Sequence, residues 1–287
     1  MGSERLVVVL LMAVNGLAWW SMERRTDLRE DPAEETSHLG PNLALTALLL
    51  GVNAAFDRVV AAAGLGVPRE GLLARWHLMA WASLAITIVV LDGTTFLAHV
   101  LMHKLPPAWR FHRVHHSDPR VDVTTAFRQH PLETLWRFAF LLAAAQALGA
   151  SSRAVAVYLA WSALNAQLEH AHVTLPPRLD RALRVVIATP AMHRVHHSRV
   201  PRETDSNYSN IFSFWDRAFR TYRPPQAGSA IATGLDDCDA PARLGAVDAA
   251  VPGLKPDGVG YRSAAAYRPG ITSGTPESEF IRIAVVT

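Results

Sequence analysis

The chain has 287 residues, of which 50% are apolar and only 18% are charged, a low charged fraction for a soluble globular protein. Its single cysteine, Cys238, excludes an intrachain disulfide framework and any cysteine-rich zinc or iron–sulfur site. The formal net charge is only +3, and we expect no nucleic-acid partner.

The first apolar segment, residues 6–20, is short for a membrane span, which needs about 20 residues. A cleaved signal peptide is the alternative, but no small-residue cleavage site follows, and Trp19 and Trp20 are typical of interfacial anchors. We therefore predict a retained helix. Residues 21–40 are charged and contain proline, which predicts a loop.

Further apolar segments predict membrane helices along the next part of the chain. The clearest has Trp76 and Trp81 at its start. The segments are 41–63, 77–101, 132–148 and 154–168. The last two form a helical hairpin. The fold class is therefore predicted to be all-α, an integral membrane bundle of four to five membrane helices with a histidine-rich helical cap.

We expect three regions along the chain. Residues 1–63 hold the N-terminal membrane helices and the charged loop, and residues 64–224 hold the histidine-box catalytic domain. After Pro224 and Pro225 the composition changes to Ala, Gly, Pro and Asp without helical or strand periodicity. Residues 225–287 are therefore expected to be peripheral and largely a disordered tail.

The histidines are clustered along the chain, and their spacing indicates a metal site. Of the 13 histidines, all but His38 and His77 fall within residues 99–130 and 170–197. The hexapeptide His-Arg-Val-His-His-Ser occurs twice, at 112–117 and 193–198. Positions i, i+3 and i+4 share one face of a helix, so each repeat is expected to point three imidazoles the same way. The expected metal ligands are His99, His103, His112, His115, His116, His170, His193, His196 and His197.

Four other histidines carry different expectations. His38 and His77 are isolated, so we expect surface or interface residues without a role in the site. His172 lies two residues after His170, and such neighbours rarely share a helical face, so it could bind metal or hold a ligand from behind. His130 precedes Pro131, so it could cap a helix, hold a ligand from behind, or bind metal.

Comparison with known types of metal site limits the kind of centre that these histidines could form. A zinc site uses three or four protein ligands, which this histidine set exceeds, and no His-Glu-x-x-His motif is present. A ferritin-like site is built from Glu-x-x-His motifs, and the histidines of the repeated hexapeptide belong to no such motif. An all-nitrogen dinuclear site at a membrane surface remains. Asp92, in the clearest span, is a candidate catalytic residue, with a hydrogen-bonding, substrate-channel or purely structural role.

The uneven distribution of arginine predicts how the chain is oriented in the membrane. Segments 102–131 and 178–223 are rich in Arg, whereas the opposite side offers little beyond Arg69, Arg75 and Arg153. By the positive-inside rule, the histidine boxes are expected to face the cytoplasm.

The order of boxes from about Asp92 to Tyr222 resembles the fatty acid hydroxylase/sterol desaturase superfamily of membrane di-iron enzymes. The stretches HRVHHSDPRVDVTTAFRQHPLE, HAHVTLP and ATPAMHRVHHSRVPRETDSNYSNIFSFWDRAFRTY carry the resemblance. Within the superfamily it is closest to alkylglycerol monooxygenase-like and bacterial lipid hydroxylase members. Val100 departs from the Arg of many members, and His172 stands where relatives often have Asn.

The resemblance implies two iron ions (Fe2+) on the nine histidines, O2 as co-substrate, and a lipid substrate that arrives from the bilayer. It also implies a separate electron donor, either a ferredoxin, a cytochrome or a reductase. The expected reaction is hydroxylation of a lipid C–H bond. Lipid desaturation on the same site and a metal-binding or transport membrane protein are the alternatives.

Overall fold

A computed structural model describes residues 2–25, 32–65, 70–225 and 231–235. Within these residues the chain is helical and forms no β-strand, and the only extended pairings are single bridges between Ile187 and Phe212 and between Ser198 and Thr233. The expected all-α class is therefore confirmed for the part of the chain that the structure describes.

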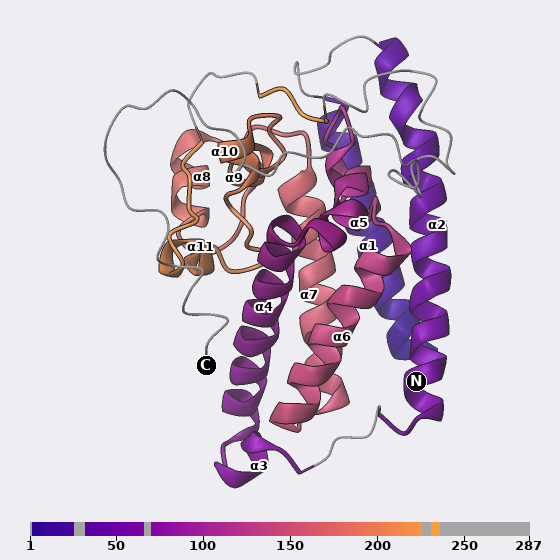
Figure 1. Ribbon diagram of the computed structural model, residues 1–287, viewed down its shortest axis with the longest axis vertical. Coiled ribbons are helices and arrows are strands. Elements are labelled where there is room, and N and C mark those ends of the chain that lie inside the picture. Colours follow the sequence, from indigo (N-terminus) through magenta and orange to yellow (C-terminus); the bar gives the residue numbers. More distant parts are fainter. Residues whose placement is uncertain (1, 26–31, 66–69, 226–230, 236–287) are drawn as a thin grey trace. The chain divides into compact units, whose positions relative to one another are not determined.

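Long helices lie side by side, most of the short helices gather toward one end of α4 and α7, and α3 lies at the other end of α4 (Figure 1). The long helices are α1 (Gly2–Glu23), α2 (Pro32–Ala62), α4 (Ala80–Lys104), α6 (Pro131–Leu148) and α7 (Ser152–His170). The shorter ones are α3 (Leu72–Arg75), α5 (Pro106–His116), the 3-10 turn η1 (Val123–Phe127), α8 (Pro177–Leu183), α9 (Pro190–His196), α10 (Pro201–Thr204) and α11 (Phe214–Ala218). Helix α4 packs against α5, α6 and α7, while α1 packs against α7 and α2 against α6.

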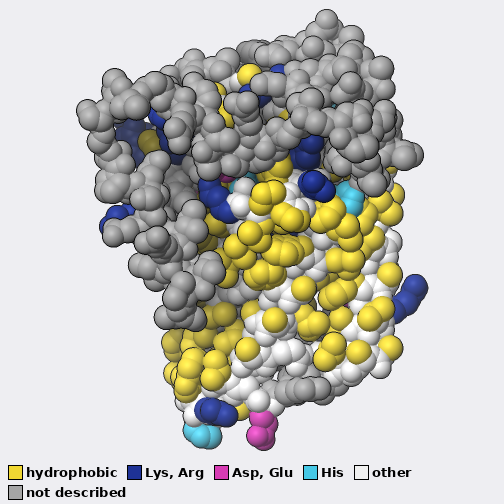
Figure 2. All heavy atoms as spheres, viewed as in Figure 1, with side chains coloured by type: hydrophobic (Ala, Val, Ile, Leu, Met, Phe, Trp, Pro, Cys, Tyr) yellow, Lys and Arg dark blue, Asp and Glu magenta, His cyan; other side chains and the backbone are white. Residues whose placement is uncertain are grey.

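Among the described residues, two helical stretches are long and apolar enough to cross a membrane. They are His38–Ala62 and Ala80–Lys104, each of 25 residues, and the N-terminal stretch Val7–Glu23 is shorter. Large apolar side chains lie exposed on α1 and α2, for example Val14 at 65% and Leu43 at 61%. Figure 2 shows hydrophobic side chains over much of the described surface on the visible face. Such a surface is typical of a protein that contacts lipid.

The loop predicted at residues 21–40 is wrong at both ends, because α1 continues to Glu23 and α2 already begins at Pro32. Pro41 therefore lies inside a helix, although proline removes one backbone hydrogen bond. On either side of it, His38 and Asn42 lie one turn apart and both contact Asp118. These tertiary contacts support the helix across the proline, and local composition gave no sign of them.

The predicted hairpin of α6 and α7 is confirmed, and its ends show why the chain turns there. Gly149 ends α6 with φ 66°, a left-handed conformation that glycine adopts at little cost. The Ser151 side chain accepts a hydrogen bond from the Ala154 N–H and so caps α7. The hairpin brings His170, at the end of α7, back toward α5.

Asp92 anchors the segment after α10 to the side of α4. Its carboxylate accepts hydrogen bonds from the Ile211 N–H (3.1 Å), the Phe212 N–H (3.0 Å) and the Trp215 indole N–H (3.1 Å). A Cβ added to the adjacent Gly93 would lie 2.7 Å from the Trp215 ring, so the two elements pack closely. These contacts show the hydrogen-bonding role that the sequence left as one alternative, and a catalytic role for Asp92 stays a prediction.

The described residues form one compact unit. The expected boundaries at residues 63 and 224 stay predictions. Most of the expected C-terminal tail lies outside the described residues. Its described part pairs with the end of the second hexapeptide repeat, because Ser198 and Thr233 form a bridge and the Arg199 N–H donates to the Ala232 carbonyl at 3.0 Å.

Candidate metal centre

The structure brings together all nine histidines that the sequence singled out, and it sorts them into two groups. Within each group, one ring nitrogen of every member lies within 4.8 Å of the others, and every member is buried. Group A comprises His99, His103, His112, His116 and His196. Group B comprises His115, His170, His193 and His197.

The two hexapeptide repeats do not form one group each. In the first repeat, the i and i+4 histidines, His112 and His116, belong to group A, and the i+3 histidine, His115, belongs to group B. The second repeat does the reverse, with His193 and His197 in group B and only its i+3 histidine, His196, in group A. The expectation of three imidazoles on one face is therefore wrong in detail. At about 100° per residue, i+3 and i+4 lie on opposite sides of i and diverge from each other.

In group A, most imidazoles are held from behind through Nδ1. His99 Nδ1 donates to the Tyr208 carbonyl at 2.8 Å, and His196 Nδ1 donates to the Ser206 carbonyl at 2.7 Å. A carboxylate holds His112, whose Nδ1 lies 3.0 Å from Glu133 Oε1. His103 Nδ1 makes no hydrogen bond among the described residues, but it lies 3.4 Å from Asp205 Oδ1. Partners of this kind fix the ring orientation of metal-binding histidines.

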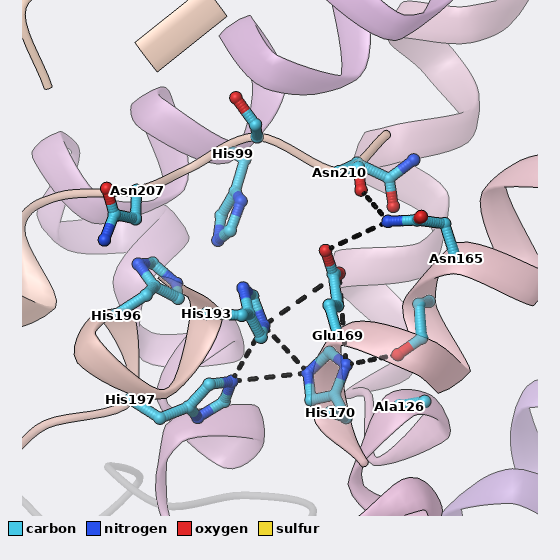
Figure 3. Close-up of polar contacts among 12 residues, drawn as sticks. His99, Ala126, Asn165, Glu169, His170, His193, His196, His197, Asn207 and Asn210 are labelled. Atoms are coloured by element: carbon cyan, nitrogen blue, oxygen red, sulfur yellow. Dashed lines mark hydrogen bonds and ion pairs between the residues drawn. The ribbon is translucent and has the colours of Figure 1, made fainter. Parts of the chain in front are cut away.

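Group B is held by fewer partners (Figure 3). His170 Nδ1 donates to the Ala166 carbonyl at 2.7 Å, and His115 Nδ1 donates to the Arg128 carbonyl at 3.3 Å. The Nδ1 atoms of His193 and His197 are buried and have no hydrogen-bond partner among the described residues. The rings of this group are therefore oriented more by packing than by polar contacts.

The tautomers show what fits at the centre of each group. A carbonyl only accepts, so His115 and His170 carry their proton on Nδ1, and Nε2 of each neutral ring presents a lone pair. These two Nε2 atoms face each other at 3.1 Å, where two lone pairs repel. In group A, the buried Nε2 atoms of His103 and His196 have no hydrogen-bond partner among the described residues. A cation among the nitrogens removes both problems, so the donor set fits a bound metal.

Burial keeps these imidazoles in the state that binds metal. Burial, with a smaller contribution from the neighbouring His112, lowers the pKa of His196 to about 3. Burial also lowers the pKa of His115, His116, His193 and His197 well below the ordinary value. These five rings are thus neutral at physiological pH, as ligation requires.

A short loop explains why residues after the second repeat matter. Asn207 adopts a left-handed backbone, with φ 53°, and its side-chain amide donates to the Met192 and Arg223 carbonyls. The Asp216 carboxylate accepts from the Tyr208 N–H at 2.8 Å. Together these contacts hold the Tyr208 carbonyl, which receives the proton of His99.

The remaining histidines lie outside both groups. His130 caps α6, because its Nδ1 accepts from the Leu132 N–H at 3.1 Å, and this confirms the capping alternative. His172 Nδ1 lies 3.2 Å from the Val121 carbonyl. His77 is exposed, as expected. His38 is not, since it is 3% exposed and lies 3.3 Å from Asp118, so the expected surface or interface placement is wrong.

The sequence did not single out the carboxylates beside the histidines. Glu133 follows the helix start after Pro131 and holds His112, Asp205 approaches His103, and Glu169 precedes His170. All three are acidic residues close in sequence to a histidine or to its helix, which is too common a pattern to be a signal. Only the tertiary structure shows which carboxylates face the groups.

The centre matches a known family. Residues 84–221 match the model of the fatty acid hydroxylase family. The predicted family resemblance is confirmed. The matched segment contains the nine histidines of both groups, together with Asn207 and Asp216.

Curated relatives agree with the match to this family. The chain is 30% identical over 148 residues to the ornithine lipid hydroxylase OlsE of Rhizobium tropici. The matched region covers 52% of the chain and 44% of that protein. It is 30% identical over 141 residues to the alkylglycerol monooxygenase of Xenopus tropicalis, covering 48% of the chain and 30% of the relative. It is 33% identical over 128 residues to the human alkylglycerol monooxygenase, covering 43% of the chain and 27% of that relative. The chain thus spans less than half the length of these relatives, and no solved structure matches it.

Proposed function

We propose that the protein is a membrane-bound non-haem di-iron oxygenase that hydroxylates a C–H bond of a lipid, using O2 and two electrons. The observation that carries the proposal is the pair of histidine groups, whose lone pairs converge at two neighbouring points. The family match and the names of the relatives support a lipid hydroxylase or monooxygenase.

One iron ion would be held by group A and the other by group B, and the metals would supply O2 activation and the oxidant for the C–H bond. The protein's own part is to orient and to shield. Carbonyls and carboxylates fix the imidazoles through Nδ1, and burial of all nine rings limits the entry of water. His99 and His103 lie toward the end of α4, so an apolar substrate could reach the centre from the bilayer.

The substrate class we propose is a fatty acyl, sterol, or ether or amino lipid, and the electrons come from a separate ferredoxin, cytochrome or reductase. A lipid comparison between a deletion strain and its complemented parent should show one lipid that accumulates and one oxygenated product that disappears. Isotopically labelled O2 should place one label in that product. Unchanged lipids in both strains would contradict a lipid substrate.

Desaturation is the second candidate, because removal of the first hydrogen atom is common to both reactions. Product mass separates them, since hydroxylation adds one oxygen and desaturation removes two hydrogens. A metal transporter is a weaker candidate, since transport sites lie near the bilayer midplane. The histidines here lie toward one end of α4 and on the short helices beside it.

We also propose four to five membrane helices with the histidine groups in a cap on the cytoplasmic side. Cysteine labelling tests the sidedness in a Cys238→Ser background. Suitable exposed sites are Arg110→Cys and Arg202→Cys near the centre and Arg75→Cys at the other end of α4. The first two should react from the cytoplasm and the third from the opposite side. Labelling of all three from one side would contradict this topology.

A further inference from the structure

Groups A and B differ in the number of donors, and one carboxylate lies where the difference arises. Group A offers five imidazoles and group B offers four. Glu169 lies next to group B, with Oε1 at 3.9 Å from His193 Nε2 and at 3.9 Å from His170 Nδ1 (Figure 3). No carboxylate is needed to bring group A to five donors.

The Glu169 carboxylate is buried and has few hydrogen-bond donors around it among the described residues. The residue is 5% exposed, and the only hydrogen bond to its carboxylate among the described residues is a long one, 3.5 Å from Asn165 Nδ2 to Oε2. Asn165 itself is mainly engaged with the Asn210 carbonyl, at 2.6 Å. A buried carboxylate with so few donors is costly unless a cation or further hydrogen bonds compensate it.

We propose that Glu169 supplies the fifth donor to the metal of group B. The inference rests on the proposed dinuclear centre and deepens it, because the metal of group A would be bound by nitrogen alone and the metal of group B by nitrogen and one oxygen. Oε1 already faces the His193 nitrogen that points into the group, and carboxylate oxygen is a common ligand for divalent metals. Its negative charge would offset part of the charge that two metal ions bring into a buried site.

Metal binding tests the proposal without any substrate. The full chain in detergent is loaded anaerobically with ferrous iron alone, washed with a chelator, and its iron is counted by elemental analysis. Titration with Co2+ alone, followed by visible absorption, reports the affinity and ligand set of each site. We compare the wild type with Glu169→Gln, which keeps the shape and removes the charge. Glu203→Gln is the control, because this residue on α10 belongs to neither group.

The wild type and Glu203→Gln should retain two metals per chain. Glu169→Gln should retain one, with the affinity for the other metal lowered at least about tenfold and the Co2+ absorption of that site changed. Glu169→Asp keeps the charge but withdraws it by one methylene, so it should weaken the same site. This second variant keeps the test valid should the Gln variant fail to fold.

Two results would overturn the role of Glu169. One is that Glu169→Gln and Glu169→Asp bind both metals with the affinity and spectrum of the wild type. The other is that a folded Glu169→Gln protein loses both metals, because group A does not include Glu169. Fewer than two metals in the wild type would instead contradict the dinuclear proposal itself.

Discussion

Groups A and B are built from the same two hexapeptide repeats, yet their rings are held differently. Polar partners hold the Nδ1 atoms of His99, His112 and His196 in group A, and Asp205 lies 3.4 Å from that of His103. In group B only His115 and His170 have such partners, and the Nδ1 atoms of the other two rings have none among the described residues. The two identical hexapeptides therefore meet different neighbours, and group A has more polar partners at Nδ1 than group B.

The largest expected effect comes from adjacent histidines that belong to different groups. His115→Ala should remove the metal of group B, and His116→Ala should remove the metal of group A. Both should abolish turnover, with losses beyond the roughly 10–100-fold typical of residues that only hold a ligand from behind. Elemental analysis, Co2+ absorption and a product assay in expression-matched membranes measure this. The same spectral change in both variants would show that the two groups are not separate sites.

The same reasoning applies to the other members of the repeats, and His77→Ala serves as the control. Single changes to Ala at His112, His193, His196 or His197 should also abolish turnover while the protein still inserts in the membrane. His77 is exposed and lies outside both groups, so its replacement should be silent. Near-full activity in any two of the six repeat variants would refute a metal role for the repeats.

The next effect concerns the carboxylate that holds group A. Glu133→Gln should weaken the acceptor for His112 Nδ1 and lower the metal affinity of group A by roughly 10–100-fold, while group B keeps its metal. Competition between the protein and a chelator, followed for each metal, gives the two affinities. Equal weakening at both groups would mean that Glu133 acts through the fold rather than through His112.

A smaller effect is expected where the N-terminal helices support the centre. His38→Ala removes a buried partner of Asp118 and Asp122, which lie 3.3 and 3.5 Å away, just after the first repeat. The free energy of unfolding should fall by about 2 kcal/mol, since two buried carboxylates each lose a partner. Thermal unfolding in detergent checks this, and both metals should remain bound. A stability equal to that of the wild type would show that Asn42 and Thr125 satisfy Asp118 by themselves.

The smallest effect belongs to a histidine that only ends a helix. His130→Ala removes the cap of α6 and should cost about 1 kcal/mol of stability. His130→Asn restores an N-cap acceptor and should recover most of that loss. Metal content should be unchanged in both variants, and loss of a metal in either would mean that His130 supports the centre beyond capping.

The sequence by itself determined the residue types and the elements of this site. The period of the apolar segments predicted α4, α6 and α7, and the repeated hexapeptide with its flanking histidines predicted all nine members of the two groups. These features are local, because helix propensity, apolar length and the spacing of ring nitrogens along a helix depend on neighbours in the chain. The extent of α2 was missed, since contacts of His38 and Asn42 with a distant aspartate support it.

Only the tertiary structure decided how the nine histidines divide between the groups and which acidic residues face them. On a helix, i+3 and i+4 diverge by about 100°, and which neighbour each meets depends on where α4, α7 and the other repeat lie. Glu133 and Glu169 are ordinary helix residues in the sequence, and packing places one behind His112 and the other beside His193. Local spacing thus predicts which histidines belong to the site, whereas their grouping arises from contacts between segments far apart in the chain.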